Sequence, residues 1–249
     1  MNNENNFNSG TSGLVLPVSK DLYPPTFQGK SRLEYYASLF NSVEINSSFY
    51  KVPMSATLRK WAESVDDNFK FTFKLSKAIT HAKGLQFNVE DVALFMQRIE
   101  HVGTKKGCLL VQFPPSIKIE NINAVEQLLL TLKKAGANKS WKIAIEFRNP
   151  SWYHNEGYDL LHAYKTVLVL HDLPASATPI LESKSEIMYL RFHGPGGRYR
   201  GSYTDDFLLQ YAGYIKKWKK EGKSIYIYFN NTMGDAINNL QTLNQFLQS

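Results

Sequence analysis

Three arginines (Arg191, Arg198 and Arg200) and an imidazole lie beside a glycine-rich loop in residues 187–203. Apolar and polar residues alternate in the first part of this segment, which places Arg191 and His193 on the polar face of a predicted strand. The run Gly-Pro-Gly-Gly at 194–197 ends the strand because it favours a sharp turn, and Arg198 follows directly. Guanidinium groups beside such a loop are suited to bind a phosphate or a carboxylate. The same pattern also fits a surface hairpin with solvated arginines.

Carboxylates and further cations occupy the same kind of position elsewhere in the chain. The alternation recurs in residues 42–46, 69–75, 142–148 and 224–230. Glu146 is the best candidate for a general base, and Arg148 beyond it is suited to hold an anion. Glu44 and Lys74 fall on neighbouring predicted strands and are expected to form an ion pair. A lysine in a partly dry site has a lowered pKa, which suits a proton shuttle or an amine nucleophile, whereas a permanent pair with Glu44 would keep it charged.

Eight predicted strands must position these side chains. They cover residues 7–13, 42–46, 69–75, 107–113, 141–147, 166–171, 186–193 and 224–229. Helical spacing of apolar residues predicts helices at 32–40, 55–64 with Ser55 as N-cap, 88–102, 121–135, 155–164 and 204–221, and a last helix from 231 or 232. Residues 174–185 are expected to form a loop without a full helix.

Strands and helices thus alternate with a repeat of roughly 30 residues, which is typical of βα units. This pattern predicts an α/β fold with a single (β/α)8 TIM barrel, a closed parallel sheet with helices outside. An open doubly wound sheet is the alternative. It is disfavoured because no Gly-x-Gly-x-x-Gly motif follows the first strand and because its central strands would be apolar on both faces.

The composition fits a globular chain whose 249 residues suffice for one barrel. Residues 1–8 are predicted to be a disordered polar tail and residues 9–249 the barrel domain. The single cysteine, Cys108, is expected in the core. Neither a secretory signal nor an apolar run of the ~18 residues that a membrane span needs is recognised, so the cytoplasm and no membrane partner are expected. The net charge of +7 favours acidic partners, although the lysine run at 216–220 is more typical of a solvated helix face.

Several motifs spread along the chain resemble one known family. They are Val-Glu-Ile-Asn-Ser-Ser-Phe-Tyr at 43–50 with Pro53, Ile-Thr-His at 79–81, Gln-Phe-Pro-Pro at 112–115, Glu-Phe-Arg-Asn-Pro-Ser-Trp at 146–152, Leu-Arg-Phe-His-Gly at 190–194 and Tyr-Phe-Asn-Asn at 228–231. In this order they resemble the YecE-like family (DUF72) of domains of unknown function. The resemblance implies a TIM barrel, an analogy with barrel endonucleases at the level of fold, and no established activity. Leu14 stands where that family usually has a tryptophan, which leaves the role of the first loop open.

Barrel active sites lie at the carboxyl ends of the strands, and this rule selects the candidate residues. The catalytic candidates are Glu146, Lys74 and Glu44, and the substrate-binding candidates are Asn46, His81, Gln112, Arg148, Asp172, Arg191, His193, Arg198, Tyr199 and Asn230. Each could instead make a hydrogen bond or ion pair that closes the barrel mouth. No cofactor is predicted. A divalent metal on Glu44, His81, Glu146, Asp172 and His193 is a weaker alternative, because the interleaved lysine and arginines would repel a cation.

These residues favour an enzyme that binds an anionic, phosphorylated small molecule and uses a glutamate for acid–base chemistry. Hydrolase, lyase and isomerase reactions all fit this description. A barrel that binds or processes nucleic acid is one alternative, because the chain is basic and aromatic residues lie near the predicted mouth. A non-catalytic binder of an anionic ligand is the other. The sequence predicts no oligomeric state.

Overall fold

The computed structural model describes residues 6–137, 141–180 and 185–248. Its strands are β1 (Phe7–Thr11), β2 (Ser42–Ile45), β3 (Lys70–Lys74), β4 (Lys106–Gln112), β5 (Lys142–Glu146), β6 (Val167–His171), β7 (Ile187–Phe192) and β8 (Ser224–Phe229). All neighbouring strands are parallel, in the order β1-β8-β7-β6-β5-β4-β3-β2. The eight strands form a nearly closed barrel, which confirms the predicted TIM-barrel fold.

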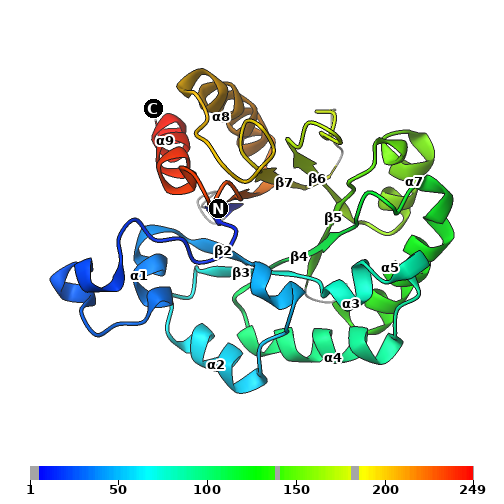
Figure 1. Ribbon diagram of the computed structural model, residues 1–249, viewed down its shortest axis with the longest axis horizontal. Coiled ribbons are helices and arrows are strands. Elements are labelled where there is room, and N and C mark those ends of the chain that lie inside the picture. The colour runs from blue at the N-terminus through cyan, green and yellow to red at the C-terminus, as the bar shows by residue number, and fades with distance from the viewer. Residues whose placement is uncertain (1–5, 138–140, 181–184, 249) are drawn as a thin grey trace.

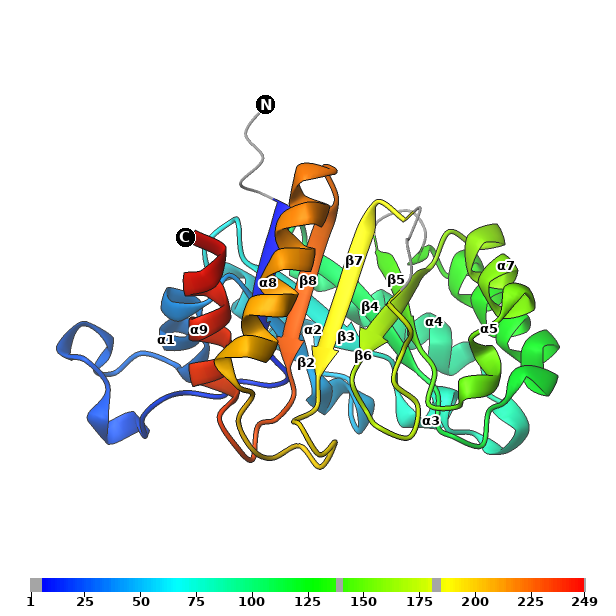
Figure 2. The same ribbon diagram turned by 90° about the horizontal axis from the view of Figure 1, so that it is seen from above.

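The helices lie outside the strands (Figure 1). They are α1 (Arg32–Leu39), α2 (Ser55–Glu63), α3 (Lys77–Thr80), α4 (Val89–Ile99), α5 (Ile122–Lys134), α7 (Asn155–Ala163), α8 (Asp205–Lys220) and α9 (Ala236–Gln248). Figure 2 shows the arrowheads of β7 and β8 pointing to the same end of the barrel, where the loops that follow both strands lie. No helix in the described ranges is both long enough and apolar enough to cross a membrane.

Three predicted boundaries need correction. β1 begins at Phe7, so the polar tail does not extend to residue 8; residues 1–5 lie outside the described residues. The N-cap of α2 is Met54, and Ser55 is the first helical residue. The last helix starts at Ala236, because the residues before it form a turn. The described part of the predicted 174–185 loop contains no helix, and residues 181–184 lie outside the described residues.

Strands β1 and β2 close the barrel with few backbone contacts of their own. Ser12 and Glu44 form a single parallel bridge, and the Gly13 N–H donates to the Glu44 carbonyl over 2.7 Å. Next to this bridge, the Thr11 N–H donates to the phenol oxygen of Tyr36 (2.7 Å), which in turn donates to the Ser42 carbonyl (3.1 Å). The phenol of α1 therefore links the two strand backbones where they do not bond directly.

The apolar residues form two layers. The outer layer packs the sheet against the helices and contains the alternating phenylalanines of β3, Phe71 and Phe73. The inner layer fills the barrel lumen with Cys108, Leu110, Ala144, Val167, Val169, Tyr189, Tyr226 and Tyr228. Beyond this layer, toward the carboxyl ends of the strands, the lumen side chains become charged. The alternation in the sequence therefore separates a helix-facing face from a lumen face, and the lumen face carries the candidate site.

Candidate active site

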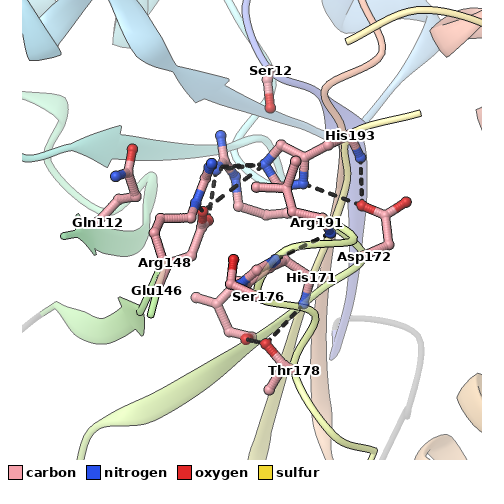
Figure 3. Close-up of polar contacts among 12 residues, drawn as sticks. Ser12, Gln112, Glu146, Arg148, His171, Asp172, Ser176, Thr178, Arg191 and His193 are labelled. Carbon is pink, nitrogen blue, oxygen red and sulfur yellow. Dashed lines mark hydrogen bonds and ion pairs between the residues drawn. The ribbon is translucent and has the colours of Figure 1, made fainter. Parts of the chain in front are cut away.

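A single buried guanidinium stands at the centre of the charged end of the lumen (Figure 3). Arg191 of β7 is 1% exposed and donates through Nη2 and Nε to the two carboxylate oxygens of Glu44 on β2, at 2.7 and 3.0 Å. Its Nη1 donates to Oε2 of Glu146 on β5, at 2.6 Å. One side chain thus joins two carboxylates that come from separate parts of the barrel, and it offsets the cost of burying both charges.

Glu44 has every oxygen engaged. Oε1 also accepts from Ser12 Oγ (2.6 Å), and Oε2 accepts from the Tyr189 phenol (2.5 Å). Burial alone would raise the pKa of Glu44, but the charge and hydrogen bonds of Arg191, with those of Ser12 and Tyr189, lower it below its usual value. Glu44 is therefore an ionised structural partner of Arg191.

Glu146 is held by two guanidiniums. Arg148 Nε donates to its Oε1, and Arg191 donates to its Oε2. Burial opposes ionisation, yet Arg148 and Arg191 together hold the pKa of Glu146 well below its usual range. A carboxylate stabilised in this way is a weak proton acceptor. The arrangement suits Glu146 to orient the guanidiniums better than to act as the predicted general base.

His193 links these arginines to Asp172. Its Nδ1 lies 3.2 Å from Asp172 Oδ1, and its Nε2 lies 3.1 Å from Arg148 Nη2 and 3.2 Å from Arg191 Nη1. Guanidiniums only donate and an ionised carboxylate only accepts, so the ring proton must be on Nδ1 and the lone pair on Nε2. Burial, against the hydrogen bond to Asp172, lowers the pKa of His193 to about 4, so the imidazole is neutral near pH 7.

Asp172 is fixed by two further donors. It accepts from the backbone N–H of His193 (2.7 Å) and from the phenol of Tyr203. Tyr203 also accepts from the Gly194 N–H, which ties the glycine-rich loop to the network. The turn after β7 therefore holds Asp172 and His193 in place.

Lys74 does not form the predicted pair with Glu44. That prediction is wrong because Arg191 and two hydroxyl donors occupy the carboxylate. Lys74 Nζ instead lies 4.1 Å from the centroid of the Phe49 ring, and no described carboxylate forms an ion pair with it. Burial, followed by the charge of Arg191, lowers the pKa of Lys74 to about 8 against the attraction of Glu146 and Glu44.

The remaining candidates lie around this network with differing roles. His81 is half-buried, bonds Thr80 Oγ1 through Nδ1 (2.9 Å) and contacts Phe49 edge-on. Gln112 donates to the carbonyl of its own neighbour Phe113 (2.9 Å). Asn46 and Asn230 are both near or in the interior: the Oδ1 of Asn46 is buried without a hydrogen-bond partner among the described residues, and Asn230 is buried. The ring of Tyr199 lies 5.7 Å from that of His193. Arg198 is exposed and is not part of the network.

Sequence reasoning missed four polar residues of the site. Tyr189 shares the polar face of β7 with Arg191, so the alternation could have selected it. Ser12 follows β1 and Tyr203 lies in a loop, and they reach Glu44 and Asp172 only through tertiary contacts. His171 accepts from the Leu173 N–H and donates to the Phe147 carbonyl (2.9 Å), which gives it a structural role beside Asp172.

Among the side chains that the structure describes, no three from His, Cys, Asp and Glu converge as metal ligands would. Glu146, Asp172 and His193 lie near one another, but Arg148 and Arg191 stand among them. The metal alternative stays a prediction.

The chain is similar to proteins whose functions are not known. The family model described as "Protein of unknown function DUF72" matches residues 9–249. The UPF0759 protein YunF of Bacillus subtilis (strain 168) is 26% identical over 249 residues, covering 88% of this chain and 87% of that protein. The UPF0759 protein YecE of Escherichia coli (strain K12) is 27% identical over 125 residues, 50% of this chain and 44% of that protein.

A solved structure shows the same fold. The crystal structure of a DUF72 family protein from Enterococcus faecalis V583 superposes with a TM-score of 0.80 at 22% identity, covering 98% of this chain and 96% of that one. At this identity the likeness shows the fold alone. The match of the family model over residues 9–249 confirms the resemblance that the sequence motifs indicate.

Proposed function

The chain belongs to the DUF72 family of proteins of unknown function. For this chain, we propose an enzyme that binds a small anionic substrate at the carboxyl end of the barrel. Lys74 is the acid–base group in this proposal, and Arg148 helps to hold the anion. Glu146 positions Arg148, and Arg191 with Glu44 completes the same buried network. A phosphorylated or carboxylated small molecule is the substrate class, and the reaction is a proton-transfer step within an isomerase, lyase or hydrolase.

The proposal rests on Lys74, a cation that pairs with no described carboxylate. The charges that act on it are two carboxylates (Glu44 and Glu146) and two guanidiniums (Arg148 and Arg191). The Lys74 ammonium adds a positive charge to this balanced set, and it has no direct carboxylate partner among the described residues. A half-buried ammonium without a partner can bind an incoming anion.

The pKa of Lys74 also suits a proton carrier. A value of about 8 leaves roughly a tenth of the amine neutral at pH 7, so both forms are available near neutral pH. Glu146 lacks this property because Arg148 and Arg191 keep it ionised. We therefore assign to Lys74 the acid–base role that the sequence predicted for Glu146.

Binding of inorganic phosphate tests the anion site. We expect phosphate to bind to the wild type in calorimetric titration and binding to Lys74→Met to be at least about tenfold weaker, since a charge-assisted contact is lost. Lys70→Met is the matched control, because Lys70 lies at the opposite end of the same strand and donates to the Thr104 carbonyl. Unchanged binding in Lys74→Met would overturn the assignment.

Turnover tests the catalytic half of the proposal. A panel of small phosphorylated and carboxylated metabolites, followed by NMR, should show product with the wild type and Lys70→Met. Lys74→Met should lose at least about a hundredfold in rate, as expected for loss of an acid–base group. Binding without product for every compound that binds would instead support the non-catalytic binder.

A further inference from the structure

An open cavity of about 430 Å³ lies at the carboxyl end of the barrel, and one of its lining residues, Phe49, contacts Lys74. The turn after β2 contributes Phe49 and Tyr50 to its wall, and the segment after β3 contributes Ser76, Lys77, Ala78 and His81. Its volume falls in the range of sites for small organic ligands. The network around Arg191 does not account for this cavity.

Three rings surround the cavity. Phe49 contacts Tyr50 edge-on, with centroids 5.1 Å apart, and contacts His81 edge-on, with centroids 5.0 Å apart. Phe49 is nearly buried, whereas Tyr50 is 80% exposed. Burial and the charges of Lys74, Lys77 and Arg148 lower the pKa of His81 to about 4, so its ring is neutral near pH 7. Three of the lining side chains are therefore aromatic rings, and the exposed ring of Tyr50 can contact a further partner.

We propose that this cavity is a subsite for a planar aromatic ring that belongs to the same substrate whose anionic group contacts Lys74. The inference rests on the proposed function and narrows its substrate to a small aromatic phosphate or carboxylate. Phe49 joins the two parts, because its ring lines the cavity and also lies 4.1 Å from Lys74 Nζ. His81 is near enough to Lys74 and Arg148 for both charges to act on its pKa.

The polar groups of the wall favour an aromatic ring over a sugar. Ser76 Oγ accepts from the Ala78 N–H, and Thr80 Oγ1 bonds His81 Nδ1 and the Ser76 carbonyl. Thr80 is buried and does not line the cavity, so the lining offers a sugar only the hydroxyls of Ser76 and Tyr50. The edge-to-face contacts of Phe49 can instead continue onto a ligand ring, which the quadrupoles of Phe49 and Tyr50 favour.

Calorimetric titrations with inorganic phosphate, phenyl phosphate and cyclohexyl phosphate test the subsite. We expect phenyl phosphate to bind the wild type about tenfold more tightly than inorganic phosphate, as one aromatic contact supplies. Tyr50→Phe should keep this preference. Tyr50→Ala should reduce it to about twofold, with the affinity for inorganic phosphate unchanged. Tyr50 is exposed, so these variants leave the fold intact.

Each outcome separates the inference from the function on which it rests. Equal affinities for inorganic and phenyl phosphate, both dependent on Lys74, would overturn the subsite and leave the anion site standing. A preference for phenyl phosphate that depends on Tyr50 but survives in Lys74→Met would support the subsite and overturn the role of Lys74. Equal affinities for phenyl and cyclohexyl phosphate would overturn the aromatic character of the subsite.

Discussion

The buried guanidinium of Arg191 donates to two carboxylates from strands that are not neighbours, Glu44 on β2 and Glu146 on β5. Both carboxylates are fully buried. Removing the arginine would leave two charges with fewer partners in a medium that solvates them poorly. Glu44 therefore depends on Arg191 for its ion pair, whereas Glu146 also pairs with Arg148.

Arg191→Met should lower the free energy of unfolding by about 3–5 kcal/mol, the usual cost of breaking a buried ion pair. Urea denaturation measures the change. Arg198→Met is the control, because Arg198 is exposed in the neighbouring loop and should change stability by less than about 0.5 kcal/mol. A loss below about 1 kcal/mol in Arg191→Met would show that Glu44 and Glu146 find other partners.

The pKa of Lys74 predicts how stability changes with pH. The amine binds its proton with the ordinary pKa of 10.5 in the unfolded chain and with a pKa of about 8 in the folded one. Between pH 8 and 10.5 the unfolded state therefore binds more protons, so the Lys74 contribution to stability increases as the pH rises through this window.

We expect the stability of the wild type, relative to Lys74→Met, to increase by about 1–3 kcal/mol from pH 8 to 10.5. Denaturation of both proteins at several pH values gives this difference, in which the titration of the tyrosines cancels. A difference that stays flat would mean that Lys74 keeps an ordinary pKa and is permanently charged.

At the scale of elements, closure of the barrel between β1 and β2 depends on close packing around one glycine. A Cβ on Gly10 would lie 1.9 Å from the Ser42 carbonyl oxygen and 2.8 Å from the Tyr36 phenol oxygen. Real atoms do not approach so closely, so any side chain at this position must separate the strands. The phenol of Tyr36 then could no longer bond both backbones.

Gly10→Ala should therefore destabilise the protein by more than about 3 kcal/mol or prevent folding. Gly213→Ala is the matched control, and it should change the stability in the opposite direction. Gly213 lies inside α8 with no atom near its Cβ position, so alanine should stabilise the helix by about 0.5–1 kcal/mol. Thermal unfolding of both variants checks the pair, and a Gly10→Ala protein as stable as the wild type would disprove the role of Tyr36 and Gly10 in closure.

Local patterns in the sequence predicted the elements well but not all of their ends. Asn88 and Thr204, where two predicted helices begin, are N-caps, because the side chain of each accepts a backbone N–H of its own helix. The start of α9 was misplaced because a contact between loops decides it. Asn231 donates to the Gly201 carbonyl, and Gly234 packs against the backbone of Gly201. No local signal reveals a contact between residues about thirty positions apart in the sequence.

At the scale of the whole molecule, the net charge of +7 bears on nucleic acid as a partner. The excess is spread over surface lysines, including Lys217, Lys219 and Lys220 at the end of α8. Attraction of this kind is not specific and is screened by salt. We therefore expect any oligonucleotide binding to be independent of the charged end of the lumen.

Fluorescence anisotropy with a short single-stranded oligonucleotide tests this expectation. Binding at 50 mM salt should weaken at least about tenfold at 200 mM salt, and Lys74→Met should bind as the wild type does. Binding that persists in salt and disappears in Lys74→Met would favour the nucleic-acid barrel over the small-molecule enzyme.

The sequence by itself determined the barrel and the end of it that carries charge. Period-two alternation and the βα repeat are local properties, and they place Glu44, Lys74, Glu146 and Arg191 on lumen-facing positions without further information. Only the tertiary structure decided which charged side chains form ion pairs with one another. Arg191 is long enough to reach Glu44 across the lumen, so Lys74 on the adjacent strand is left beside Phe49. Such pairings depend on strand register, side-chain length and burial together, and sequence spacing encodes none of these.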